Sequence, residues 1–152
     1  MIGRGFITAI VLSVSIPYSS FAGDGKDVYG RYAYFQADTI AKQDRGPAGD
    51  EDCRMFLSSD LYDPSLAEHL TIAPGRWDDN QDVSAVTGDV ELGKRAGNVT
   101  PFTIRVESEA ADGSGDGVEP AHGTLTQHGK LALSIAIESA NGKRTLHYCR
   151  VE

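Results

Sequence analysis

The most constraining feature of this sequence is a hydrophobic alternation near its C-terminus. Large aliphatic residues alternate there with small or polar ones, in the order Leu131, Ala132, Leu133, Ser134, Ile135, Ala136, Ile137 and Glu138. Successive side chains of a β-strand point to opposite faces, so this pattern places all four large aliphatics on one face. Asn141-Gly142 follows, the preferred dipeptide of a tight type I′ hairpin. The region predicts two antiparallel strands with one buried face.

A turn centred on Asn141-Gly142 fixes an expected register for these strands. It places Ile137 opposite Leu146 and Ile135 opposite Tyr148, so large side chains pair across the strands. The opposite face then carries small residues, with Ser134 opposite Cys149 and Ala136 opposite His147. Small residues leave room for another segment of the chain to pack on that face.

The N-terminus has the pattern of a secretory signal peptide. Arg4 precedes an apolar run over residues 6–16, which is too short to span a bilayer. Small residues then lead to Ala22, after which we expect cleavage. We therefore expect residues 1–22 to be a signal peptide and residues 23–152 to be one periplasmic or secreted domain. No further segment of the mature chain is apolar enough to cross a membrane.

The two cysteines, Cys53 and Cys149, are expected to form a disulfide. Export delivers them to an oxidising compartment, where pairing is the default state of two cysteines. The bond would close a loop of nearly the whole mature chain, for which a chain-entropy model gives roughly 4–5 kcal/mol of stabilisation. The segment around residue 53 should then lie on the small-residue face that carries Cys149.

Glycines recur between short stretches that are rich in β-branched and aromatic residues. We expect strands over residues 28–36, 53–59, 83–92 and 99–108, in addition to the C-terminal hairpin. Asp63-Pro64 combines an N-cap residue with a first-turn proline and predicts one short helix over residues 64–70. Acidic loops are expected over residues 42–52 and 111–120.

The resulting fold class is all-β. Seven or eight sequential strands with short turns predict a small antiparallel meander that closes into a barrel or forms a two-sheet sandwich, and closure is favoured because it removes exposed edges. The shape of such a barrel resembles that of the lipocalin-like barrels, although the sequence carries no family motif. A likeness of shape says little about function.

The charge balance narrows the classes of partner. Removing residues 1–22 takes away Arg4 and no acid, which leaves 13 basic and 22 acidic side chains. Such a chain repels the phosphate backbone, so we do not expect nucleic-acid binding. The favoured partner is a small molecule or another exported protein, and a cationic protein suits the charge best.

The sequence contains few motifs that indicate catalysis or metal binding. Asp112, Ser114 and Asp116 match the first half of a calcium loop, but the position that requires a bidentate Glu is Gly123. The alternative is a solvated acidic loop, and no other cofactor is expected. No nucleophile elbow or paired metal-binding histidines are found.

Candidate contact residues are therefore few. Tyr32 and Tyr34 share a strand face and could line a barrel mouth, and Trp77 could anchor an interface. His147 could form a patch with the small residues of its face. Ordinary packing is the alternative for each of them.

Three functions follow in order of preference. The first is a non-catalytic exported binding protein for a small ligand or an envelope-protein partner. The second is an acidic inhibitor of a cationic hydrolase, such as a lysozyme or a protease, acting through the loop over residues 42–52. The third is a hydrolase that uses clustered carboxylates and His147. A filled interior would argue against a ligand held inside the barrel.

Overall fold

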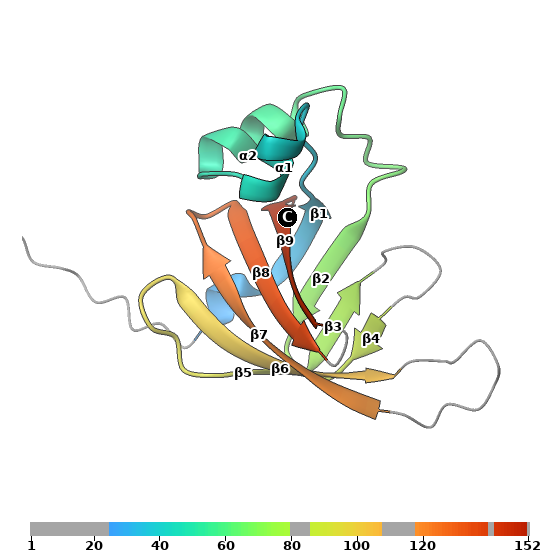
Figure 1. The fold of residues 1–152 in the computed structure, drawn as a ribbon, viewed down its shortest axis with the longest axis vertical. Helices are drawn as coiled ribbons and strands as arrows, with labels where there is room; N and C mark the ends of the chain where they lie inside the picture. The colour runs from blue at the N-terminus through green and yellow to red at the C-terminus, as the bar shows by residue number, and fades with distance from the viewer. Residues whose placement is uncertain (1–24, 80–85, 108–117, 140–141, 152) are drawn as a thin grey trace, which may run out of the picture.

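A computed structural model describes residues 25–79, 86–107, 118–139 and 142–151 (Figure 1). These residues form one antiparallel sheet of nine strands that curls into a nearly closed barrel. The strands are β1 (Gly30–Tyr34), β2 (His69–Ala73), β3 (Arg76–Asp79), β4 (Val86–Gly88), β5 (Val90–Leu92), β6 (Val99–Glu107), β7 (Val118–Gln127), β8 (Ala132–Ser139) and β9 (Gly142–Arg150). The predicted all-β class and the antiparallel meander are confirmed.

The barrel is open between β4 and β5, two strands that follow one another in the middle of the sequence. The order is β4-β3-β2-β1-β9-β8-β7-β6-β5, so β1 pairs with β9 and the two free edges belong to β4 and β5. Each of these edge strands has three residues. Short edge strands offer few unpaired backbone groups to other chains, which limits edge-to-edge association.

Large side chains fill the interior of the described barrel. The most deeply buried are Trp77, Tyr32, Tyr148, Leu70, Ile72, Leu125, Leu133 and Ile135. Trp77 of β3 stacks on Phe102 of β6, with 5.1 Å between ring centroids. Because β3 and β6 lie next to the two edge strands, this contact joins the two ends of the sheet across the opening. The 3₁₀ turn η1 (Lys26–Val28) adds the fully buried Val28 to this core.

The C-terminal hairpin has the predicted faces but a different register. Ile135 pairs with Leu146 and Ile137 with Arg144, two residues away from the expected pairing, and Ser139 pairs with Gly142. Gly142 therefore belongs to β9 and not to the centre of the turn. A shift of two residues keeps every side chain on its face, so the hydrophobic pattern does not distinguish the two registers.

The connection between β1 and β2 leaves the sheet and forms what we call the helical lobe, residues 35–68. It contains α1 (Ile40–Arg45) and α2 (Asp50–Leu57), and it lies over the β1, β8 and β9 end of the barrel (Figure 1). The strand expected over residues 53–59 is therefore wrong. Of the loop expected over residues 42–52, only residues 46–49 lie outside the two helices. Cys53 and Phe56 lie three residues apart on one buried helical face, a spacing that a strand does not give.

The short helix predicted over residues 64–70 is also wrong. The Asp63 side chain accepts a hydrogen bond from the Ser65 backbone N–H (2.8 Å), and the Asp63 carbonyl accepts from Leu66 and Ala67. This single turn does not continue, because β2 begins at His69. Burial of apolar side chains from β2 inside the barrel outweighs the local helix-start signal.

The disulfide joins the helical lobe to the outer face of the sheet. Cys53 of α2 and Cys149 of β9 are bonded, with 5.4 Å between their Cα atoms. Ala33 and Ala132 lie beside them in a second, smaller core that also contains Phe35 and Phe56. The expected pairing and the packing of the residue 53 segment on a small-residue face are confirmed.

Two sequence predictions fall outside the described residues. They are the signal peptide over residues 1–22 and the calcium-loop residues Asp112, Ser114 and Asp116. Within the described part of the chain, neither α1 nor α2 has the length or apolar character required for a membrane span.

Candidate functional site

The helical lobe carries an apolar surface that solvent reaches. Ile40, Leu66, Met55 and Leu61 are 82%, 81%, 59% and 45% exposed, and these are the large exposed hydrophobic side chains of the described residues. All four belong to one connection between neighbouring strands. Scattered single apolar residues are normal on a protein surface, and a contiguous apolar patch is what marks an interaction site. Of the four residues, Met55 and Leu61 share the lining of one groove.

A groove runs between the end of β1, α1 and α2. It is open to solvent, has a volume of about 380 Å³, and includes Met55 and Leu61 in its lining. Phe35 and Phe56 line it as well, and they pack edge to face with 5.3 Å between centroids. Lys42 and Arg45 of α1 contribute to its wall. The groove has an apolar lining with charged groups among it.

The surroundings of this groove are acidic. Residues 35–68 contain eight acidic and three basic side chains, a net charge of −5 against −8 for the whole chain. Three of the acids, Asp50, Glu51 and Asp52, form the first turn of α2, where negative charge also stabilises the helix dipole. The helical lobe therefore combines an apolar centre with an excess of negative charge.

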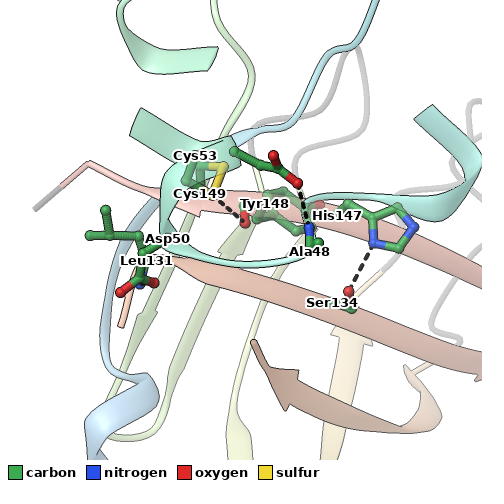
Figure 2. The surroundings of a disulfide bond; sticks show 9 residues. Ala48, Asp50, Cys53, Leu131, Ser134, His147, Tyr148 and Cys149 are labelled. Carbon is green, nitrogen blue, oxygen red and sulfur yellow. Dashed lines mark hydrogen bonds between the residues drawn. A yellow bond between two sulfur atoms is a disulfide. The ribbon is translucent and has the colours of Figure 1, made fainter. Parts of the chain in front are cut away.

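Histidine 147 connects the helical lobe to the sheet. Its Nε2 lies 3.1 Å from the Asp44 carbonyl oxygen in α1. Its Nδ1 lies 2.9 Å from Ser134 Oγ, and this hydrogen bond is drawn in Figure 2. Nε2 of His128 lies 2.9 Å from the same hydroxyl oxygen. A Cβ atom on Gly46 would lie 2.2 Å from the His147 ring, so the glycine allows the backbone after α1 to rest on the imidazole.

Further bonds hold the lobe in place beside the disulfide. The Asp50 carboxylate accepts from the Leu131 backbone N–H (2.7 Å), which ties the start of α2 to the loop before β8. The Gln43 side chain donates to the Phe35 carbonyl (2.6 Å) and accepts from the Ala37 N–H (2.8 Å). These bonds give the lobe a defined orientation on the barrel.

The predicted contact residues do not form one site. Tyr32 and Trp77 are buried in the barrel interior, where the Tyr32 hydroxyl donates to the Val28 carbonyl (2.7 Å) and accepts from Arg150 (2.8 Å). Burial raises the pKa of Tyr32, and the hydrogen bond from Arg150 partly opposes that effect. Packing and hydrogen bonding inside the core therefore account for the positions of the Tyr32 and Trp77 side chains.

Tyr34 and His147 lie elsewhere. Tyr34 is half-buried and packs edge to face on Tyr148, with 5.7 Å between centroids. Burial, and next the charge of Asp79, raise the pKa of Tyr148. His147 lies on the outer face beneath α1, away from the barrel core that holds these tyrosines.

Sequence reasoning missed the residues that define this surface. Met55 was assigned to a strand, Leu61 was given no role, and His128 was interpreted as a hairpin residue. The patch of His147 with the small residues of its face was a prediction, and the contact with Ser134 agrees with it. The spacing of Cys53 and Phe56 could have indicated a helix with one buried and one exposed face. The bond from His147 to Asp44 spans 103 residues and carries no local signal.

A second hollow lies on the outer face of β5, β6 and β7. It has a volume of about 450 Å³, and Asp89, Glu91, Thr103, Arg105 and Pro120 line it. Both signs of charge are present among these residues, without a large aliphatic or aromatic side chain. The helical lobe is therefore the stronger candidate for an interaction site.

Metal ligands do not gather in the described residues, where no group of three or more His, Cys, Asp or Glu side chains is placed to hold an ion. Comparison of the chain with protein-family models, with curated proteins and with solved structures found no match. The helical lobe, with its groove and its acidic surroundings, is the candidate functional site of this protein.

Proposed function

We propose that this protein is a non-catalytic binding module, exported to the periplasm or beyond, that binds a cationic protein through its helical lobe. The main supporting observation is that Ile40, Met55, Leu61 and Leu66 are exposed on the connection between β1 and β2. A long excursion that is anchored to a rigid sheet by a disulfide and side-chain bonds is typical of a binding element.

The filled interior favours a protein partner over a small ligand held inside the barrel. Tyr32, Trp77 and Tyr148 are each at most 1% exposed and occupy the centre of the described barrel. Lipid- or ligand-carrying barrels instead keep a cavity open there. The apolar surface available for contact lies outside, on the helical lobe.

Charge supports a basic partner. The lobe has a net charge of −5, and opposite charge on a partner accelerates the diffusional encounter. The apolar centre would then supply the contacts that slow dissociation, because desolvated apolar side chains dominate interface energetics. A basic exported hydrolase fits this description, and its inhibition would follow if the lobe covered its active-site cleft.

The test begins with capture and ends with measured affinities. The mature protein is immobilised and exposed to periplasmic and secreted proteins at low and at high salt, and the captured protein is identified and purified. Met55→Ser combined with Leu61→Ser should weaken its binding by at least about tenfold, which corresponds to ~1.4 kcal/mol. Thermal unfolding of the double variant should stay close to that of the wild type, because both side chains are exposed.

A matched pair of charge variants tests the electrostatic part. Glu51 lies on the helical lobe and Glu91 on β5, and both are exposed. Glu51→Gln should lower the association rate constant of the basic partner, and Glu91→Gln should lower it less. The proposal fails if no protein is captured, or if the folded Met55→Ser, Leu61→Ser variant binds as tightly as the wild type.

A further inference from the structure

The groove of the helical lobe has a fixed apolar floor. Phe35 and Phe56 line it and are only 7% and 5% exposed, and their rings pack edge to face. The Phe56 ring also packs on that of Tyr62, with 5.5 Å between centroids. Phe56 follows the disulfide-bonded Cys53 by about one helical turn, so the bond to β9 holds this floor on the sheet. A partner side chain that enters the groove therefore meets a surface that is already in place.

The size of the groove suits a single large side chain. Its volume of about 380 Å³ lies near the lower end of the roughly 300–1,000 Å³ range of ligand pockets. Met55 and Leu61 form an exposed rim, and the unbranched thioether side chain of Met55 can adjust to the shape of a guest. The groove therefore admits one side chain of a partner and not the whole face of a helix.

One cation in the lining of the groove has no acidic partner. The Lys42 ammonium pairs with Asp38 at 2.9 Å, and the Asp52 carboxylate accepts from the Ala48 backbone N–H at 2.7 Å. Arg45, the last residue of α1, makes no side-chain hydrogen bond or ion pair with the described residues. Its guanidinium is therefore available to a group that enters the groove.

The charges of the lining favour an uncharged guest with a π surface. Asp38 and Asp52 balance Lys42 and Arg45, so a charged side chain of either sign gains no net attraction inside the groove. An aliphatic side chain would cover the guanidinium of Arg45 without replacing the water that it loses. The face of an aromatic ring attracts a guanidinium, and its edges pack well on phenylalanine rings and on the Met55 thioether.

We infer that the groove binds one aromatic side chain of the basic partner, and that this residue stands next to Lys or Arg in the partner's sequence. The flanking cations lie outside the groove, over a lobe whose net charge is −5. Aromatic side chains that fill a preformed pocket are typical of the residues that dominate interface energetics. The inference rests on the proposed function for its partner, whereas the preference of the groove can be measured without that partner.

Short peptides and NMR test this preference on the mature protein. The probes are acetyl-Lys-Trp-Lys-amide and acetyl-Lys-Leu-Lys-amide, which differ in the central side chain and carry the same charge. Met1 lies in the expected signal peptide, so Met55 gives the single methionine methyl signal, and the ring current of a bound tryptophan should shift it. Titration of the Phe56 and Leu61 amide signals up to about 10 mM peptide should give an affinity at least about fivefold higher for the tryptophan peptide.

Two arginine variants test the contribution of the guanidinium. Arg45 lines the groove, whereas Arg54 is exposed on α2 and does not line it. Arg45→Gln and Arg54→Gln each remove one positive charge from the lobe, so each changes the long-range attraction of the two peptides alike. Arg45→Gln should lower the ratio of the tryptophan affinity to the leucine affinity at least about twofold, and Arg54→Gln should leave this ratio unchanged. Both variants should stay folded, because both side chains are exposed.

Three results would overturn the aromatic preference. They are a leucine peptide that binds as tightly as the tryptophan peptide, a Met55 methyl signal that does not move at about 10 mM tryptophan peptide, and an Arg45→Gln variant that keeps the full affinity ratio. Acetyl-Glu-Trp-Glu-amide should bind more weakly than acetyl-Lys-Trp-Lys-amide, and equal affinities would contradict the basic flanks.

Partner binding separates this inference from the proposed function. If the captured protein depends on Met55 and Leu61 but the groove does not distinguish the two peptides, the binding site stands and the aromatic preference fails. If the groove prefers the tryptophan peptide but the captured protein ignores the Met55→Ser, Leu61→Ser change, the aromatic preference stands and the proposed function fails.

Discussion

Replacing both cysteines by alanine tests how the disulfide stabilises this protein. Cys53 and Cys149 are separated by 96 residues, so in the unfolded protein the bond closes a loop of that length. Chain-entropy arguments assign a loop of about 100 residues ~4.7 kcal/mol at 25 °C. Both sulfurs are fully buried, so alanine avoids leaving a polar group in the small outer core. We expect the variant to lose about 4–5 kcal/mol of unfolding free energy.

Urea unfolding followed by tryptophan fluorescence measures this loss. Trp77 is the single tryptophan of the chain, and it stacks on Phe102 in the barrel core, so its emission reports the barrel and not the helical lobe. Met55→Ala is the matched control on the exposed side of α2 and should cost less than about 0.5 kcal/mol. A loss below about 1 kcal/mol in the double cysteine variant would refute the argument that the bond acts on the unfolded chain.

Further predictions concern packing, backbone and pH. Trp77→Ala should cost about 3–5 kcal/mol in chemical denaturation, because it leaves a large cavity in the barrel. Gly46 and Gly75 both have positive φ, but a Cβ on Gly46 would meet the His147 ring, whereas a Cβ on Gly75 would meet nothing within 4 Å. In thermal unfolding, Gly46→Ala should therefore destabilise the protein by at least ~2 kcal/mol more than Gly75→Ala. The raised pKa of Tyr148 means that the unfolded chain releases this proton first, so stability should fall above about pH 10. Spectrophotometric titration should show that a late fraction of the phenols, with Tyr148 among them, ionises only with unfolding. The lowered pKa of His128 means that, as the pH falls, the unfolded chain protonates this histidine before the folded protein does, so stability should decline below about pH 6.5. His128→Gln should reduce this decline when the midpoint of urea unfolding is measured as a function of pH.

The sheet could be predicted from the sequence because its signals are local. The alternation around Ile135 and Ile137 determines which face of β8 is buried, and this prediction holds. The register does not follow from the same pattern, because the observed pairing of Ile135 with Leu146 differs by two residues and preserves all faces. The disulfide was predicted from the number of cysteines together with the expected signal peptide, and the structure contains it.

The candidate site could not be predicted in the same way. Its helices are short, and the continuous apolar run of Met55, Phe56 and Leu57 in α2 is compatible with a strand as well as with a helix. Short apolar runs fit either structure until a partner surface selects one of them. The contacts that place α1 involve Asp44, Ser134 and His147, which are distant in sequence and adjacent only in the folded protein.

The pairing of β1 with β9 has a consequence for the order of folding. Ala33 of β1 lies beside Cys149 of β9, so β1 must wait for a strand that emerges more than a hundred residues later. A chain that is still being synthesised or translocated therefore keeps the barrel open and both sulfurs unpaired until β9 has appeared. Were the chain exported as we propose, this late closure would keep the polypeptide unfolded during translocation and would leave disulfide formation to the oxidising side.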